Sequence, residues 1–199
     1  SLVAMRKDDL KARLAWSTVS QLAYITSAAL IPVSAGLIAG GLHMVTHAVA
    51  KITLFMCAGA IYVASGATKV SGMRGLGRRM PIVFTCFLLG ALSVVGLPPF
   101  AGMLSKFLLL TAAFGSEEWI TGAAMIFSSL LSMFYFAPIA IRGLLPPADD
   151  APPADFIRPG GAPGLTIAPV VITTAACIAL FFFADEVTSF LIPIAGATP

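Results

Sequence analysis

The sequence alternates between long apolar stretches and short polar segments. Five apolar stretches can be marked, at residues 14–31, 35–64, 81–114, 119–141 and 165–183. Each is roughly 17 residues or longer, and a helix of about 20 residues at 1.5 Å per residue crosses the hydrocarbon core of a bilayer. Strands of a membrane β-barrel would instead show short segments of strict alternation. The pattern therefore predicts an all-α integral membrane protein, with five transmembrane segments in a single membrane domain over 1–199.

The third stretch, at 81–114, is too long and too irregular for one straight helix. Its middle contains Gly96, Pro98, Pro99 and Gly102. A helix cannot continue unchanged through two prolines, because each removes a backbone donor and its ring clashes with the preceding turn. The stretch is therefore either one discontinuous transmembrane helix, broken near 96–99, or two short spans joined by a turn.

The distribution of lysine and arginine favours the discontinuous helix. If the third stretch is one span, the successive segments outside the spans carry 4, 0, 4, 0, 2 and 0 cationic residues. These are Arg6, Lys7, Lys11 and Arg13, then Lys69, Arg74, Arg78 and Arg79, then Arg142 and Arg158. Cytoplasmic segments carry the excess of such residues. We therefore expect a multi-pass protein of the cell (inner) membrane, with its N-terminus cytoplasmic, its C-terminus outside, and a proline- and aspartate-rich cytoplasmic loop at 142–164.

Composition supports the membrane assignment and limits the chemistry. Hydrophobic residues make up 58% and charged residues 11%, against about 25% charged in an ordinary soluble domain, which excludes a soluble or disordered chain. The three cysteines are dispersed in apolar stretches, and the chain contains no dinucleotide fingerprint, phosphate-binding loop or iron–sulfur cysteine cluster. We expect no cofactor, no metal site, no catalytic residue and no nucleic-acid partner. No signal peptide is visible, and because Ser1 is not an initiator methionine we expect a processed chain or a fragment.

Four ionisable side chains fall inside the apolar stretches: His43, His47, Lys51 and Lys106. A charge at the bilayer centre costs at least about 2.5–3.5 kcal/mol, so such residues usually mark an ion pathway. His43, His47 and Lys51 follow one another at intervals of four, which on a helix forms a ladder about 12 Å long on one face. Histidine can donate from one ring nitrogen and accept at the other, so we predict a proton relay. The alternative is that the histidines bond to neighbouring helices and that Lys51 extends to the membrane surface.

Lys106 follows the end of the predicted break, Pro99, by seven residues. A broken helix frees carbonyl and amide groups, which a membrane tolerates only where they line a cavity or pack within protein. Transporters use such breaks near the midplane to bind ions, so we predict that Lys106 belongs to the relay. The alternative is an interfacial lysine at the end of a short helix, but the leucines at 108–110 argue against an interface.

Other polar side chains accompany the ladder. Ser17, Gln21 and Tyr24 share one face of the first predicted helix, and they could equally extend a water wire or form interhelical hydrogen bonds. Thr46 and Thr53 add hydroxyl groups to the helix that carries the ladder.

Three motifs together resemble a known family. They are DLKARLAWSTVSQL at 9–22, HMVTHAVAKITLF at 43–55 and GLPPFAGMLSK at 96–106. In this order they are similar to a helix start, a histidine-rich helix and a lysine-bearing discontinuous helix of the proton-conducting antiporter-like subunits shared by respiratory complex I (NADH:quinone oxidoreductase) and Mrp-type cation/proton antiporters. The stretch 59–81 looks more like the Mrp-type (D-like) branch of this family than the respiratory one.

The resemblance implies a bundle of about fourteen helices with two inverted repeats, each containing a broken helix, of which this chain would be the C-terminal part. The glutamate and lysine of the family's first half-channel have no counterpart here, so a carboxylate partner for the lysines would lie in the missing half or in a neighbouring subunit. The implied function is a proton-translocating subunit of a multisubunit antiporter or of an NADH:quinone oxidoreductase-like complex. Its partners would be other membrane subunits, the lipid bilayer and protons, with exchange of sodium left open.

Two other functions fit the sequence. The chain could be a non-conducting membrane scaffold, whose polar groups only tie helices together, or it could contribute to a quinone site in an oxidoreductase complex. A scaffold predicts that substitutions in the ladder impair assembly, whereas a relay predicts that they impair proton flux. The chain contains no catalytic motif, so its sequence does not decide whether the parent complex is an enzyme.

Overall fold

The computed structural model describes residues 1–145 and 163–196, and over these residues the chain is helical. In chain order the elements are α1 (Leu2–Arg6), α2 (Leu10–Leu30), α3 (Ser34–Ser65), the 3-10 turn η1 (Val70–Met73), α4 (Leu76–Arg79), α5 (Pro81–Val95), α6 (Ala101–Gly115), α7 (Trp119–Leu144), α8 (Gly164–Phe182) and α9 (Ala184–Ile194). The described ranges contain an isolated β-bridge, between Asp9 and Lys69, but no strand. The prediction of an all-α protein is therefore confirmed for them. Most of the predicted loop at 142–164, including Arg158, lies outside the described residues.

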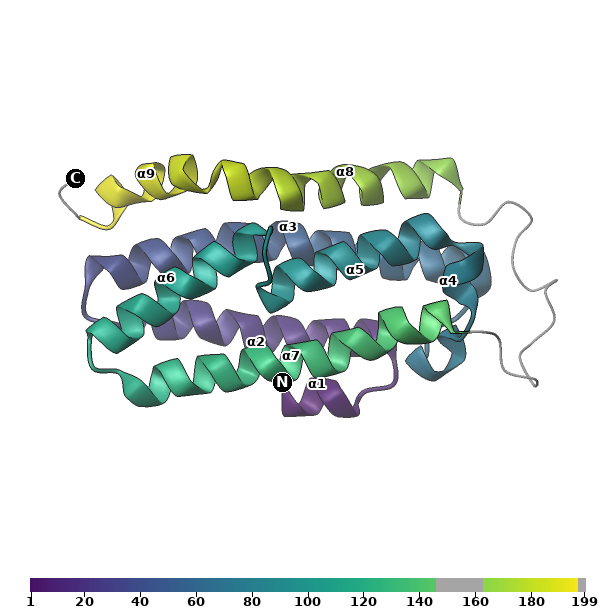
Figure 1. The fold of residues 1–199 in the computed structure, drawn as a ribbon, viewed down its shortest axis with the longest axis horizontal. Helices are drawn as coiled ribbons and strands as arrows, with labels where there is room; N and C mark the ends of the chain where they lie inside the picture. The colour runs from purple at the N-terminus through teal and green to yellow at the C-terminus, as the bar shows by residue number, and fades with distance from the viewer. Residues whose placement is uncertain (146–162, 197–199) are drawn as a thin grey trace.

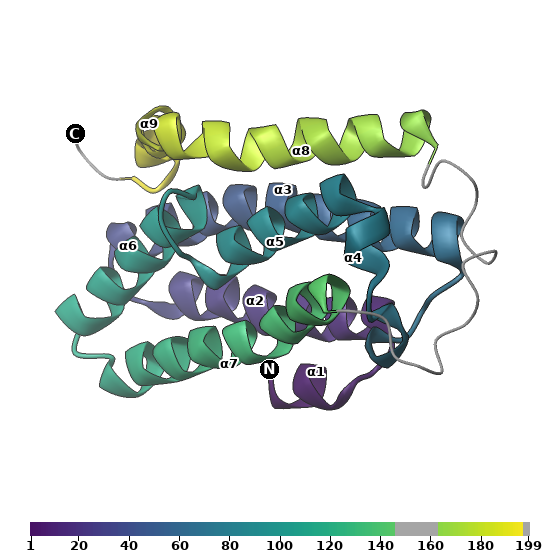
Figure 2. The same cartoon turned by 45° about the vertical axis from the view of Figure 1, so that its right-hand side comes forward.

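Helix α3 lies at the centre of the bundle (Figures 1 and 2). It packs against α2, α5, α6, α8 and α9, and α7 packs against α5 and α6. The short helix α1 contacts α2 and α7. Helices α8 and α9 form an outer layer on the side of α3 opposite to α2 (Figure 1). Because five helices pack against α3, a side chain on α3 can face a neighbouring helix without reaching the outer surface.

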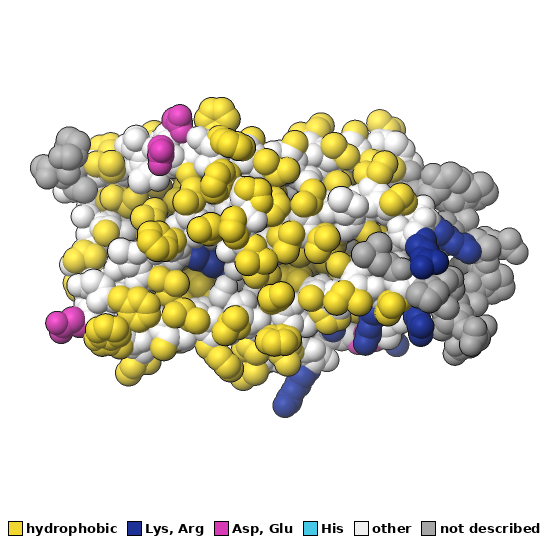
Figure 3. All heavy atoms as spheres, in the orientation of Figure 1, with side chains coloured by type: hydrophobic (Ala, Val, Ile, Leu, Met, Phe, Trp, Pro, Cys, Tyr) yellow, Lys and Arg dark blue, Asp and Glu magenta, His cyan; other side chains and the backbone are white. Residues whose placement is uncertain are grey.

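The outer surface of the bundle is apolar. Leu30, Ile120 and Leu165 are 83%, 87% and 92% exposed, and hydrophobic side chains dominate the face in Figure 3. So extensive an apolar surface is typical of contact with lipid or with other membrane helices. Three described helices, α3, α7 and α8, are long and apolar enough to cross a bilayer, and α5 and α6 are shorter apolar helices. On the face in Figure 3, cationic side chains gather mainly at one end of the molecule.

The third apolar stretch forms two helices. Helix α5 ends at Val95, Gly96 adopts a left-handed conformation with φ of 90°, and α6 begins at Ala101. A Cβ atom at Gly102 would lie 1.9 Å from the carbonyl oxygen of Ser93, so the first turn of α6 can lie this close to the end of α5 only because residue 102 has no side chain. The residues that mark the break in the sequence lie at or beside this junction: Gly96, Pro98, Pro99 and Gly102.

The segment before α2 is fastened to the segment after α3. The amide of Val70 donates to the carbonyl of Asp8 at 2.8 Å. The hydroxyl and the backbone amide of Ser71 donate to the Asp8 carboxylate, at 2.6 and 3.0 Å. These bonds, the hydroxyl bond above all, stabilise the ionised form and hold the pKa of Asp8 below its ordinary value.

Replacing Ser71 with alanine is expected to raise the pKa of Asp8, because the hydroxyl bond is the largest stabiliser of its charged form. The folded-state pKa is depressed, so the contact stabilises the fold above the ordinary aspartate pKa and is lost as the pH falls through the folded value. NMR titration of the Asp8 carboxyl carbon measures the change, with Ser189→Ala as the control at an exposed serine. An Asp8 pKa that is equal in the wild type and in Ser71→Ala would contradict this assignment.

Candidate functional site

The three ladder residues are buried on α3. His43, His47 and Lys51 are 2%, 7% and 6% exposed, although charged and polar side chains are rarely buried so deeply unless they have partners. Their four-residue spacing places them along one face of the helix. Two of them, Lys51 and His43, bond to α2, so the ladder lies at the α2–α3 contact. Thr53 lies on another side of α3, where its hydroxyl donates to the Val49 carbonyl and lies 3.6 Å from the Cys177 sulfur.

Lys51 forms the end of the ladder nearest the start of α2. Its ammonium group donates to the hydroxyl oxygen of Ser17 and, at 3.2 Å, to the carbonyl oxygen of Leu14. The Ser17 hydroxyl in turn donates to the same carbonyl, at 2.7 Å. The ammonium nitrogen also lies 5.3 Å from the centre of the Phe136 ring on α7, within the range of a cation–π contact. The charge is therefore held by neutral groups from α2 and α7.

His43 joins α2 to α6. Its Nε2 atom lies 3.1 Å from the Gln21 Oε1 atom, and its Nδ1 atom lies 3.0 Å from the Ser105 hydroxyl. With the proton on Nε2, the imidazole donates to Gln21 and accepts from Ser105. In the other tautomer the proton is on Nδ1, and the Gln21 amide is flipped so that its NH₂ group donates to Nε2. The Nδ1–H group then donates to the Ser105 hydroxyl, which itself donates to the Gly102 carbonyl at 3.1 Å. The same contacts thus accommodate both tautomers of His43.

The His43 ring is stacked between two other rings, those of Tyr24 and His47. The Tyr24 ring is stacked on it at a centroid distance of 5.4 Å, and the His47 ring at 6.0 Å. The Tyr24 hydroxyl donates to the Met125 carbonyl on α7 at 2.7 Å. The Nε2 atom of His47 has no hydrogen-bond partner among the described residues, and neither does the NH₂ group of Gln21.

Lys106, on α6, donates hydrogen bonds to the end of α5. Its ammonium group donates to the carbonyl oxygens of Val94 and Val95, at 2.7 and 2.8 Å, and to the Ser129 hydroxyl at 2.9 Å. The last carbonyls of a helix lack intrahelical donors and carry partial negative charge, so a cation there is stabilised. The Ser129 hydroxyl also donates to Val95, at 2.9 Å. The helix break and the lysine therefore form one structural unit.

The structure brings all the predicted site residues together. Ser17 bonds to Lys51, Gln21 bonds to His43, and Tyr24 stacks on His43 with the Lys106 nitrogen 5.4 Å from the Tyr24 ring centre. Ser105 bonds to His43 and directly precedes Lys106 on α6. The result is a buried line of polar groups from the start of α2 to the helix break. Hydrogen bonds join its members to neighbouring helices, whereas His43 and His47 are joined by ring stacking at 6.0 Å and the Nε2 atom of His47 has no partner among the described residues.

Sequence reasoning missed Ser105 and Ser129, which belong to this cluster, and Tyr135, whose hydroxyl lies beside that of Ser17. Ser105 could have been found from its position beside Lys106 in the sequence. In the structure Thr46 also bonds to it, at 3.3 Å. Ser129 and Tyr135 carry no such signal, because they come from α7, whose sequence shows no histidine, lysine or carboxylate before Arg142. Only the packing of α7 against α5 and α6 brings Ser129 to Lys106.

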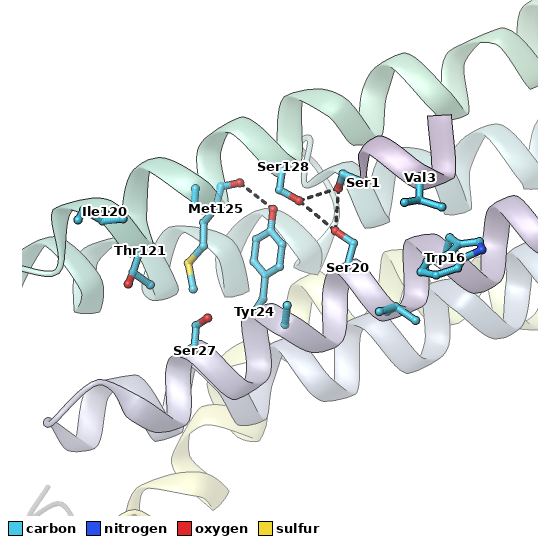
Figure 4. A pocket seen from close by; sticks show the side chains of 13 residues that line it. Ser1, Val3, Trp16, Ser20, Tyr24, Ser27, Ile120, Thr121, Met125 and Ser128 are labelled. Carbon is cyan, nitrogen blue, oxygen red and sulfur yellow. Dashed lines mark hydrogen bonds between the residues drawn. The ribbon is translucent and has the colours of Figure 1, made fainter. Parts of the chain in front are cut away.

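A pocket of about 500 Å³ adjoins the cluster, between α1, α2 and α7 (Figure 4). Its wall includes the hydroxyl groups of Ser1, Ser20 and Ser128, which lie 2.7 to 3.0 Å from one another. Tyr24 lines the same pocket, and Figure 4 shows its hydroxyl directed toward α7, next to Ser128. Tyr24 therefore separates the pocket from Lys106.

The chain is similar to membrane proteins of known families. Residues 1–132 match the family model described as "NADH:quinone oxidoreductase/Mrp antiporter, TM". The chain is 29% identical to NADH-quinone oxidoreductase subunit N of Desulforudis audaxviator, over 98% of this chain and 40% of that protein. It is 32% identical to one of the Na(+)/H(+) antiporter subunits of Bacillus subtilis, over 96% of this chain and 26% of that protein. A chain in the structure of the Mrp complex from Dietzia sp. DQ12-45-1b superposes with a TM-score of 0.85 at 23% identity, over 98% of this chain and 43% of that one.

The fold and its buried polar line thus define a membrane protein of the antiporter-like class. The chain belongs to the transmembrane family shared by NADH:quinone oxidoreductases and Mrp antiporters, which confirms the resemblance carried by the three sequence motifs. It spans less than half the length of these two relatives.

Proposed function

We propose that the chain is the C-terminal part of a proton-translocating subunit, in which Lys106, His43, His47 and Lys51 pass protons through the membrane interior. It would cross the membrane five times, with α5 and α6 together forming one discontinuous span and the N-terminus on the cytoplasmic side. Its partners would be the remaining half of the same polypeptide and other membrane subunits of an antiporter or respiratory complex. The positive-inside count and the gathering of cationic side chains at one end (Figure 3) support this orientation.

The observation that carries the proposal is the environment of Lys106. Its ammonium group is bonded to two carbonyls and a hydroxyl, all of them neutral. A lysine held by a carboxylate would keep its proton, whereas one held by dipoles can release it when a second cation approaches. The adjacent Ser105 and His43 offer the released proton a path, because His43 can be satisfied in either tautomer.

Proton movement along the line would use side chains that are bonded, stacked or one helical turn apart, with water bridging the longer steps. A proton leaving Lys106 reaches His43 by way of the Ser105 hydroxyl. It continues to His47, whose ring is stacked on His43, and then to Lys51, one helical turn further along α3. The unpartnered Nε2 atom of His47 can bind a water molecule, which would bridge the longer steps.

Replacing Lys51 with alanine in the full-length subunit is expected to lower proton flux at least about a hundredfold, the lower end of what one proton-transfer group contributes. Flux would be followed with a pH-sensitive dye in proteoliposomes that contain the whole complex. Lys11→Ala is the matched control, because Lys11 is exposed near the same end of α2. Assembly is measured separately by gel filtration.

The two outcomes separate the relay from a scaffold. Assembled Lys51→Ala complexes with low flux support the relay. Normal flux would contradict the relay, and loss of assembly with normal flux per assembled complex would instead support a scaffold.

A further inference from the structure

Tyr135, on α7, lies between the pocket and the polar line but belongs to neither set of bonds. Its side chain is 1% exposed, and its hydroxyl makes no hydrogen bond of normal geometry among the described residues. The hydroxyl nevertheless lies beside those of Ser1 and Ser17. Leaving a buried hydroxyl without a partner is costly, so a hydroxyl in this position is poised to accept or donate a bond when a neighbour or a water molecule approaches.

Ser1 and Ser17 belong to different networks. Ser1 bonds to Ser20 and Ser128 in the wall of the pocket, at 2.7 and 2.8 Å. Ser17 is bonded to the ammonium group of Lys51. The phenol of Tyr135 is thus the group that separates the hydroxyls of the pocket from the Lys51 end of the relay.

The position of Tyr135 is held from both sides. Its ring packs against Phe136 at a centroid distance of 4.7 Å. The guanidinium group of Arg13, on α2, donates to the Tyr135 carbonyl at 3.0 Å and to the Lys7 carbonyl at 2.7 Å. Arg13 therefore ties the α1–α2 junction to the backbone of α7 at this residue.

We propose that the pocket between α1, α2 and α7 is a water-filled mouth of the proton path, and that Tyr135 is the proton-carrying gate between this mouth and Lys51. The inference rests on the proposed function. When Lys51 is neutral, the phenol would release its proton toward the Ser17 hydroxyl, whose own proton passes to the amine. The phenol would take a replacement proton from the Ser1, Ser20 and Ser128 hydroxyls, which are reprotonated by a hydronium ion in the mouth that becomes water. Each hydroxyl loses one O–H bond and gains one, so Tyr135 and the serines stay neutral, and the charge passes from the hydronium ion to the new N–H bond on Lys51.

Tyr135→Phe in the full-length subunit tests the gate, because it removes the hydroxyl and keeps the ring that packs on Phe136. We expect flux to fall about a hundredfold or more with assembly unchanged. Tyr62→Phe, at a tyrosine that is 49% exposed, is the control for the same chemical change. Ser17→Ala should lower flux similarly, and the double variant should be no worse than either single one, since both interrupt the same path. Wild-type flux in Tyr135→Phe, or additive losses in the double variant, would overturn the gate.

A separate measurement tests the mouth. A cysteine in place of Ser20 should react with a small, membrane-impermeant thiol reagent, because a thiol reacts as a thiolate and therefore needs water. Leu22→Cys is the control, since residue 22 is 48% exposed on the apolar exterior away from the pocket. Lack of labelling at Ser20→Cys would show that the pocket is dry and would contradict the mouth.

If Lys51→Ala loses flux while Tyr135→Phe keeps it, only this inference fails. If Lys51→Ala keeps flux, the proposed function itself fails.

Discussion

Replacing Lys106 with alanine is expected to abolish proton transport by the full-length subunit, while the complex still assembles. The substitution removes the only cation at the α5–α6 junction in the described structure and leaves the Val94 and Val95 carbonyls without it. Each buried acceptor left unpaired costs about 1–3 kcal/mol unless water replaces the donor. Transport would be measured in proteoliposomes, and assembly by recovery of the intact complex.

Lys106→Arg separates the chemical role of Lys106 from its structural one. Arginine can still donate to the carbonyls that end α5, but it does not release its proton in proteins. We expect this variant to assemble and still not transport. Lys69→Arg, at an exposed lysine, is the matched control and should transport normally. Transport by Lys106→Arg at the wild-type rate would show that the lysine only caps the helix.

Gly102→Ala is expected to destabilise the junction between α5 and α6 strongly. Its Cβ atom would lie 1.9 Å from the Ser93 carbonyl oxygen, a backbone atom that cannot move aside without shifting α5. Overpacking of this kind costs typically about 1–3 kcal/mol and more where the backbone must shift, so we expect a loss at or above the upper end. Thermal unfolding of the purified complex measures the loss.

Gly59→Ala is the matched control for this substitution. Gly59 lies within α3, and a Cβ atom there would meet nothing within 4 Å. Alanine has the higher helix propensity, by about 1 kcal/mol, so this variant should be as stable as the wild type or more so. Equal melting temperatures for Gly102→Ala and the wild type would show that α5 and α6 can separate freely.

The local features of the site could be predicted because they depend on short-range geometry. The four-residue spacing of His43, His47 and Lys51 follows from the helical repeat, and their burial agrees with the cost of exposing such groups to lipid. The same repeat explains why Thr53 lies away from the ladder: two residues beyond Lys51 correspond to a rotation of about 200°. The glycines and prolines between 96 and 102 mark the place where α5 ends and α6 begins.

Contacts between distant residues could not be predicted in this way. That Ser129 bonds to Lys106, and that Tyr135 lies beside Ser17, depends on how α7 crosses the other helices. A serine or tyrosine on an apolar helix is equally compatible with an internal bond to its own backbone. Before the helices are packed, nothing distinguishes Ser129 from Ser132, which bonds to the Ser129 carbonyl of its own helix at 2.6 Å.

The sequence by itself determined the class of protein, the helical ladder, the interrupted third stretch and the family, because apolar length, residue spacing and proline chemistry are properties of neighbouring residues. The tertiary structure alone decided which oxygens hold each amine, that the ammonium group of Lys106 caps the broken helix, and that a phenol lies beside the Ser1 and Ser17 hydroxyls. These contacts join helices that are far apart in the chain, and their geometry depends on how whole helices pack against one another.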